Sequence, residues 1–366
     1  MVTRRTLLKN ACKGSAALLL GNACMLVSAA TAAKRWRMPD EGDPHLRTWM
    51  AFGSSSDIWG KELLPHVQTD LARIALSIAR FEPVSMLVRK QDVAAARRLM
   101  GSRVTLVECP IDDLWIRDAG PVFVKNVSGD KAAVDFNFNG WGDKQEHKLD
   151  AAVAAFVAEA SRVERLDTRL ILEGGGIEVD GEGTAIITES CVLNPNRNPG
   201  LSKRECEIEL KALLGLEKVI WLPGIAGQDI TDGHTDFYAR FVRPGAVVAA
   251  FDPDPYSFDH DVTKEHLDLL RRATDAKGRS VEVAVLQAPA KPRNPYRSKD
   301  FAAGYINFYV CNGAVIAPEF GDVKSDQAAR GTLARLFPKR EVVQVGIDAI
   351  AAGGGGIHCA TQQEPR

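Results

Sequence analysis

Outside its first residues, the chain lacks both long apolar runs and dense clusters of one charge. Its 366 residues carry a net charge of -1, without the basic excess of nucleic-acid-binding proteins, so we expect no nucleic-acid partner. After residue 33, no apolar run approaches the roughly 20 residues that a membrane-spanning helix needs. The chain also lacks CxxC pairs, which excludes zinc-ribbon and thioredoxin motifs.

Residues 1–33 have the layout of an export leader. Arg4 and Arg5, followed by Leu7-Leu8-Lys9, resemble a twin-arginine signal, and an Ala- and Leu-rich tract ends in SAATAA before Lys34. A frayed basic start is the alternative. We expect recognition by the twin-arginine machinery, cleavage near residues 30–33 and an exported bacterial protein, periplasmic or secreted. Interruption of the tract by polar and glycine residues argues against a stable membrane anchor.

The remainder, residues 34–366, reads as one α/β domain. It contains no Pro/Gly/Ser-rich linker, and helical periodicity alternates with short apolar strands. The predicted helices are 61–81, 91–100, 151–160, 205–214, 260–273 and 325–337. The predicted strands are 84–88, 104–107, 218–222, 280–286 and 341–345.

A coarse fivefold repeat underlies this alternation. Five segments each place a polar cluster before a short apolar hairpin, at intervals of about fifty to seventy residues. Units of this size arranged radially predict a propeller-like domain whose polar clusters meet at the axis. The marker residues of the five clusters are Asp118, Glu173, His234, Asn307 and Cys359.

The run GGGGIHC, which ends at Cys359, is the strongest chemical signal. Four consecutive glycines suit a loop whose backbone approaches another group closely, and the cysteine that follows can present its sulfur to a ligand. A flexible tail with a structural cysteine is the alternative. The apolar strand expected at 341–345 favours the functional interpretation.

The run DGHTD supplies a histidine and a carboxylate. If the segment is a strand, His234 and Asp236 point to the same face and form an oriented acid/base pair. Two metal ligands or a solvated loop are the alternatives. No third ligand is obvious in the pattern, so we expect no metal.

Two further clusters carry carboxylates. DDLWIRDAGP brings Asp112, Trp115 and Asp118 close together in sequence, although a charged turn is an equal alternative. EGGG begins with Glu173; it lacks the Lys-Ser/Thr ending of a phosphate loop and fits a hairpin mouth better.

Together these motifs provide one cysteine, one histidine and several carboxylates. Carboxylates pair bidentately with the N–H groups of a guanidinium, and a cysteine nucleophile suits attack on its electrophilic carbon. A small guanidino compound is therefore the expected substrate, without a cofactor. The sequence leaves open whether the protein forms a homo-oligomer.

The chain resembles agmatine deiminases and the related bacterial peptidyl-arginine deiminases of the guanidine-modifying superfamily. The resemblance runs from about residue 38 to 363. It is carried by MPDEGDPHLRTWMAFG, the W-x-R-D-x-G-P run, FNFNGWG, EGGG, GHTD, NFYVCNG and GGGGIHCATQQ.

The resemblance implies a five-bladed α/β propeller that hydrolyses agmatine to N-carbamoylputrescine and ammonia through an S-amidino-cysteine. It implies Cys359 as nucleophile, His234 as general acid/base, and Asp118 and Asp236 as the carboxylates that hold the guanidinium. The expected substrate-binding residues are Glu173, Trp115, Asp112 and Trp141.

Three departures from the family pattern bear on the substrate. Gly356 stands where agmatine deiminases commonly have Asn, the segment RSKDFAAGYI differs from the usual Leu-Pro-Ala-Ser-Tyr pattern, and most relatives have no leader. A peptidyl-arginine deiminase is the main alternative. An amidinotransferase and a guanidino-compound binding protein are the others.

Overall fold

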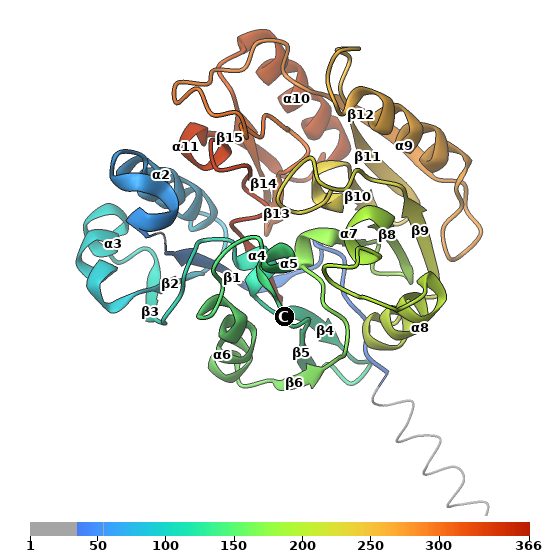
Figure 1. Ribbon diagram of the computed structural model, residues 1–366, viewed down its shortest axis with the longest axis horizontal. Helices are drawn as coiled ribbons and strands as arrows, with labels where there is room; N and C mark the ends of the chain where they lie inside the picture. The colour runs from blue at the N-terminus through green and yellow to red at the C-terminus, as the bar shows by residue number, and fades with distance from the viewer. Residues whose placement is uncertain (1–34, 54) are drawn as a thin grey trace, which may run out of the picture.

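Five small β-sheets organise the described part of the chain, residues 35–53 and 55–366 of a computed structural model. The sheets surround a common centre and make one mixed α/β domain (Figure 1). The expected leader, residues 1–33, lies outside the described residues. The five sheets are β16-β1-β2-β3, β4-β5-β6, β7-β8-β9, β10-β11-β12 and β13-β14-β15.

The strands are short, and most of their residues are buried. Their bounds are β1 (His45–Phe52), β2 (Val84–Val88), β3 (Thr105–Glu108), β4 (Val122–Lys125), β5 (Lys131–Asp135), β6 (Glu164–Asp167), β7 (Ile177–Val179), β8 (Thr184–Thr188), β9 (Lys218–Leu222), β10 (Ala239–Arg243), β11 (Ala246–Phe251), β12 (Glu282–Gln287), β13 (Tyr309–Cys311), β14 (Ala314–Glu319), β15 (Glu341–Gly346) and β16 (Gln362–Pro365).

Four of the sheets repeat one ββαβ pattern. An antiparallel pair is followed by a helix and a parallel strand, as parallel pairing requires a crossover. In the remaining sheet β16 takes the place of the first strand, because it pairs antiparallel with β1. The connecting helices are α2 (Ser56–Ile78), α3 (Val93–Met100), α6 (Val153–Ser161), α8 (Lys203–Leu214), α9 (His260–Arg272) and α10 (Val323–Leu336).

The predicted helices and strands are confirmed, with shifts at their ends. The largest shift is in α2, which begins at Ser56 rather than residue 61. The Ser55 side chain caps the helix by accepting from the Ile58 backbone N–H. Gly60, with φ 69°, interrupts the helix, and this break hides the first turn from a periodicity argument.

Shorter helical turns connect these elements, and among them α4, η3 and η4 pack against one another at the centre. The turns are α4 (Ile116–Ala119), α5 (Gly140–Asp143), α7 (Glu189–Val192), α11 (Asp348–Ala351), η1 (Lys90–Asp92), η2 (Asp150–Ala152), η3 (Gly174–Gly176) and η4 (Thr235–Phe237). The segment around His234 and Asp236, for which the sequence left a strand or a loop open, is the 3-10 turn η4 with His234 at its N-cap. Asp232 and Gly233 precede it with φ of 62° and 86°, which a strand does not accommodate.

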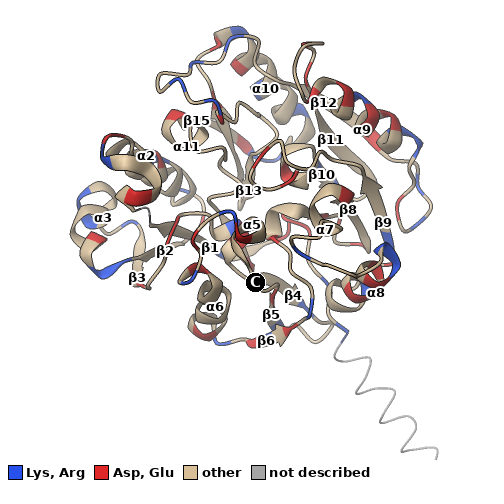
Figure 2. Ribbon diagram, in the orientation of Figure 1, with Lys and Arg blue, Asp and Glu red and all other residues tan. Residues whose placement is uncertain are grey.

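Charges of both signs lie on the outer helices. Figure 2 shows acidic and basic residues interspersed along the outer helices α8, α9 and α10. Among the described residues, no helix has the length and apolar character needed to cross a membrane. The five cysteines of the described part are all buried and free: Cys109, Cys191, Cys206, Cys311 and Cys359.

Candidate active site

Cys359 lies in a tight turn between α11 and β16, directly after the glycine run. The run packs so closely on two indole rings that side chains would not fit. A Cβ at Gly353 would lie 2.2 Å from the Trp59 ring, and a Cβ at Gly355 would lie 2.2 Å from the Trp115 ring. The glycines therefore serve close packing, and they place the cysteine at the centre of the molecule.

The Cys359 sulfur faces one donor and one carboxylate. The Asn307 side-chain amide donates to Sγ at 3.3 Å, and Sγ lies 3.6 Å from Asp236 Oδ2. Burial raises the pKa of the Cys359 thiol well above its usual value, and the nearby carboxylates of Asp236 and Asp118 raise it further. Without a ligand, the sulfur is therefore a neutral thiol.

His234 projects into the same centre from the N-cap of η4. Its Nε2 lies 3.2 Å from Glu173 Oε2 and its Nδ1 3.7 Å from Asp118 Oδ1. Burial lowers the pKa of His234, but the Asp118 charge and the bonds on its other side outweigh burial and raise the pKa well above its usual value. The ring is therefore held as a protonated donor whose Nδ1 has no hydrogen-bond partner in the described part of the chain.

Asp118 and Asp236 form a pair that we call the carboxylate clamp. Asp118, on α4, accepts from Trp141 Nε1 at 3.0 Å and from the Gly175 backbone N–H at 3.1 Å. Burial raises the pKa of Asp118 to about 6, despite the opposing effect of His234.

Asp236 keeps one oxygen free. Its Oδ2 lies 2.7 Å from His358 Nδ1, whereas its Oδ1 is buried and has no partner among the described residues. Burial raises the pKa of Asp236, but the hydrogen bond and charge of His358 outweigh burial, and the net shift is downward. Within the clamp, Asp236 therefore remains ionised at lower pH than Asp118 does.

The position of Gly175 marks the space between these groups. A Cβ there would lie 2.6 Å from His234 Nδ1, 2.9 Å from Asp118 Oδ1 and 3.2 Å from Asp236 Oδ2. Glycine at this position lets the backbone pack directly against the imidazole and the clamp, because any side chain would collide with both. The reactive sulfur of Cys359 lies on the other side of the clamp contact, 3.6 Å from Asp236 Oδ2.

Glu173 lies behind the imidazole, away from the clamp. Arg197 Nε donates to both of its oxygens at 2.9 and 3.0 Å, and His234 Nε2 occupies the remaining side. Burial raises the pKa of Glu173, but these partners outweigh it and lower the pKa overall. The structure therefore gives Glu173 the geometry of a group that orients His234, whereas the sequence suggested a substrate contact.

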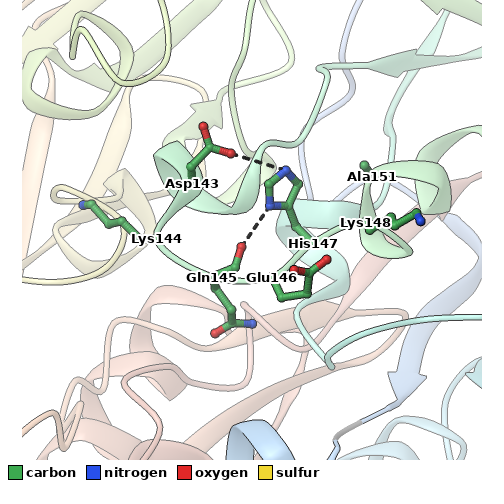
Figure 3. A pocket seen from close by; sticks show the side chains of 7 residues that line it. All are labelled: Asp143, Lys144, Gln145, Glu146, His147, Lys148 and Ala151. Atoms are coloured by element: carbon green, nitrogen blue, oxygen red, sulfur yellow. Dashed lines mark hydrogen bonds and ion pairs between the residues drawn. The ribbon is translucent and has the colours of Figure 1, made fainter.

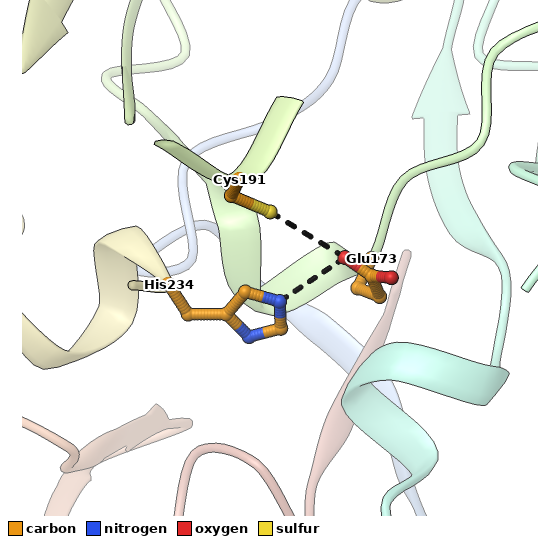
Figure 4. A group of neighbouring side chains, drawn as sticks. All are labelled: Glu173, Cys191 and His234. Carbon is orange, nitrogen blue, oxygen red and sulfur yellow. Dashed lines mark hydrogen bonds and ion pairs between the residues drawn. The ribbon is translucent and has the colours of Figure 1, made fainter. Parts of the chain in front are cut away.

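One group of described residues could in principle hold a metal ion. It consists of Glu173, Cys191 and His234, whose ligand atoms lie within 4.8 Å of one another (Figure 4). The Arg197 guanidinium already neutralises Glu173, so a metal ion would add a second positive charge beside it. The arrangement fits hydrogen-bonded orientation of the imidazole better than metal coordination.

The remaining predicted residues separate into two groups. Trp141 contacts Asp118, and Trp115 packs on Gly355 next to Trp59, with ring centroids 5.9 Å apart. Asp112 is not brought to the cluster. Its carboxylate accepts from the backbone N–H groups of Leu149 and Asp150 and so caps the following 3-10 turn.

Four contributors were not predicted as site residues. Asn307 was only a repeat marker, and His358 was overlooked although it adjoins the cysteine. Glu41 and Arg197 hold charged partners from distant segments, which no spacing in the sequence reveals. The adjacency of His358 to Cys359 was the one usable signal.

A surface pocket lies close by but is distinct from this cluster. It is lined by Asp143–Lys148 and Ala151 and contains none of the clustered residues (Figure 3). Its lining is nevertheless tied to the centre, because Lys144 Nζ donates to Asp232 and Gln145 donates to Asp113. We place the active site at the buried cluster, where the reactive groups converge.

The chain is similar to known proteins over most of its length. The model of the Porphyromonas-type peptidyl-arginine deiminase family matches residues 37–365. The chain is 40% identical to agmatine deiminase of Medicago truncatula over 363 residues, covering 90% of this chain and 96% of that protein. It is also 40% identical to agmatine deiminase of Pseudomonas aeruginosa, over 91% of this chain and 96% of that one. A structure of agmatine deiminase of Enterococcus faecalis superposes with a TM-score of 0.86 at 34% identity, over 91% of this chain and 96% of that one.

Proposed function

The chain belongs to the Porphyromonas-type peptidyl-arginine deiminase family, and on that premise we propose that it hydrolyses agmatine to N-carbamoylputrescine and ammonia. One observation carries the proposal. The buried Asp236 Oδ1 and His234 Nδ1 have no hydrogen-bond partner in the described part of the chain, and the other oxygen of Asp236 lies 3.6 Å from the Cys359 sulfur. Because buried polar atoms without hydrogen bonds are costly, this cluster is suited to a polar ligand.

We assign the architecture to a five-bladed α/β propeller. Each ββαβ unit would be one blade, and the five markers from the sequence would mark the axis. Support comes from the recurrence of one strand order in the sheets and from the contacts that join the markers: Asn307 to Cys359, Asp118 to His234 and His234 to Glu173.

In the first half of the reaction, the clamp holds the guanidinium with its carbon facing the Cys359 sulfur. The cation offsets the clamp charges, lowers the pKa of the thiol and so favours the thiolate, which is the attacking form. Sulfur adds to the carbon, His234 gives a proton to one nitrogen, and the C–N bond breaks to release ammonia. An S-amidino-cysteine remains.

In the second half, water replaces ammonia. His234, now deprotonated, takes a proton from the water as its oxygen adds to the amidino carbon. The C–S bond then breaks, sulfur leaves as the thiolate, the proton of the new hydroxyl group passes to solvent, and the neutral ureido product departs. Holding both reactants in place can supply about 7–11 kcal/mol of the barrier reduction.

The closed geometry favours a small substrate over a protein. Cys359 is only 5% exposed and Asp236 only 1%, so a guanidinium must enter almost completely to reach them. A bare alkylamine tail can follow it into the molecule, whereas the backbone beside a peptidyl arginine must remain outside. This observation favours agmatine over the peptidyl-arginine alternative.

A substrate screen tests the proposal. Agmatine, free arginine and an arginyl peptide are compared by ureido product formation, and agmatine is expected to turn over fastest. Faster conversion of the peptide would favour the peptidyl-arginine alternative. Binding without ammonia release would favour a binding protein, and transfer to an added amine would favour an amidinotransferase.

The covalent step has its own test. Cys359→Ala is expected to abolish turnover, and mass spectrometry of quenched wild-type enzyme should show an amidino adduct on the peptide containing this residue. Cys206→Ala removes another buried cysteine and serves as the matched control, with activity retained. Activity in Cys359→Ala would overturn the covalent route.

We also propose that residues 1–33 direct twin-arginine export and are then removed. The family match begins only at residue 37, which leaves this stretch outside the matched region. Cell fractionation with N-terminal sequencing tests this, alongside an Arg4→Lys, Arg5→Lys double variant. Full-length protein confined to the cytoplasm, unchanged by the double variant, would contradict the proposal.

A further inference from the structure

No residue of the N-terminal motif MPDEGDP takes part in the reaction steps, but the motif places the Glu41 carboxylate close to the clamp. Glu41 is buried, and its oxygens accept from Arg240 at 2.7 Å, from Arg117 at 3.1 Å and from the Val310 backbone N–H at 2.8 Å. Its remaining contact is His358 Nε2 at 2.8 Å. Glu41 is thus a fixed anion whose partners come from distant segments of the chain.

His358 connects this anion to the clamp. Its Nε2 bonds to Glu41 and its Nδ1 bonds to Asp236 Oδ2 at 2.7 Å. An ionised carboxylate can only accept hydrogen bonds, so both ring nitrogens must donate, and only the imidazolium can do this. With both ends held, the ring cannot rotate about its side chain without breaking a charge-assisted bond.

The backbone fixes His358 as firmly as its ring does. The Asn307 side-chain oxygen accepts from the His358 N–H at 2.9 Å and from the Cys359 N–H at 3.3 Å. The same amide group therefore sets both the imidazole and the nucleophile. A shift of His358 would move Asp236 and Cys359 relative to each other.

This geometry determines which Asp236 oxygen is available. His358 bonds to Oδ2, which also faces the Cys359 sulfur at 3.6 Å, and Oδ1 is therefore the oxygen left without a hydrogen-bond partner. When both ring nitrogens donate, the ring also places a positive charge beside Asp236. Without it, Asp236 could rotate, or accept a proton, and present a poorer surface to the cation.

We propose that Glu41 and His358 are positioning residues that hold Asp236 ionised and oriented for guanidinium capture. The inference rests on the proposed function, and it assigns a role to two residues that do not touch the substrate. The effect of their side chains on catalysis should pass through Asp236, to which the His358 ring is bonded.

A double-mutant cycle tests this route. His358→Gln is expected to lower kcat/KM for agmatine by about 10- to 100-fold, as loss of an outer partner of a reacting group commonly does. Combined with Asp236→Asn, it should add no further loss, because the group it positions has already been disabled. Equal and additive losses would show a general structural effect and overturn the proposal.

His266→Gln is the matched control. His266 is also buried, but it lies on α9 and its Nε2 accepts from the Gly224 backbone N–H at 3.2 Å, away from the clamp. Its replacement should change the melting temperature about as much as His358→Gln does, while kcat/KM stays near wild type. A parallel fall in kcat/KM would also overturn the proposal.

If His358→Gln gives no cooperative melting transition, the cycle is run with Glu41→Gln, which keeps the imidazole and removes its anionic anchor. The expected loss and its non-additivity with Asp236→Asn are the same. Failure of the proposed function is separate from these outcomes, since it would appear as absence of guanidine hydrolysis in the wild-type enzyme. An active wild type with an additive cycle would reject only the positioning role.

Discussion

Asp236→Asn is expected to have two opposite effects: it should impair catalysis and yet make the nucleophile more reactive toward an alkylating reagent. The substitution removes a charge from the clamp, so the guanidinium loses a partner and turnover falls. In the empty site the same charge opposes formation of the Cys359 thiolate. Removing it should therefore lower the pKa of the thiol.

The size of this second effect follows from the geometry. Asp236 Oδ2 lies 3.6 Å from the Cys359 sulfur. Two unit charges about 4 Å apart repel by about 4 kcal/mol at an effective dielectric constant of about 20, or about three pKa units. A thiolate of lower pKa is also a weaker nucleophile, with a slope of about 0.4–0.5, so the net gain in alkylation rate near neutral pH is about 40-fold.

The assay is the rate of iodoacetamide labelling at Cys359, followed by mass spectrometry of the peptide. Asp167→Asn, which alters an exposed carboxylate on β6, is the matched control and should label at the wild-type rate. Cys359→Ser gives the background from the other thiols. Labelling of Asp236→Asn at or below the wild-type rate would refute the electrostatic account of the raised thiol pKa.

Three further predictions follow from the clamp. The pKa of Asp118 is raised to about 6 and its ionised form binds the cation, so kcat/KM should fall as the pH drops below about 6. Because a bound cation stabilises the carboxylate, kcat should persist to lower pH. A profile of kcat/KM against pH that does not fall on the acid side would contradict this. Gly175→Ala places a Cβ 2.6 Å from His234 Nδ1 and should lower kcat/KM by about 100-fold or more, measured beside an unchanged melting temperature. Trp141→Phe removes the hydrogen bond to Asp118 and should cost about 10-fold in kcat/KM, with near-wild-type activity as the contrary result.

Much of the architecture could be predicted because local patterns carry it. Alternating helical and strand patterns predicted the α/β class, and α8 shows why such segments can be recognised in a sequence. It begins with a capping box at Ser202 and Glu205, ends at Gly215 in a left-handed conformation and buries Cys206, Leu210 and Leu214 on one side. These signals all lie within a few residues of one another.

The backbone around His234 could not be fixed from local pattern. The sequence left a strand or a loop open, whereas Asp232 and Gly233 adopt positive φ and turn the chain into η4. The histidine and Asp236 still meet in the site, although through a 3-10 turn. The pairing was therefore predictable, whereas the backbone that produces it was not.

The hydrogen-bond partners of the reactive groups could not be predicted from the sequence, because they come from distant segments of the chain. Glu41 meets His358 across almost the whole chain, and Arg197 meets Glu173 through a loop. Asp112 shows the converse case. It is adjacent to the clamp motif in sequence, but its carboxylate is used to cap a 3-10 turn.

The pairing of β16 with β1 has a consequence for the timing of activity. A ribosome makes β1 before every other described strand and β16 after them, and Cys359 precedes β16 by only a short turn. The buried Glu364 on β16 bonds to Trp49 on β1 and to Lys131 on β5, so this strand joins sheets that were synthesised long before it. The nucleophile is therefore synthesised after every other residue of the cluster, and a partly synthesised chain that lacks it has no means of attacking guanidino metabolites around it.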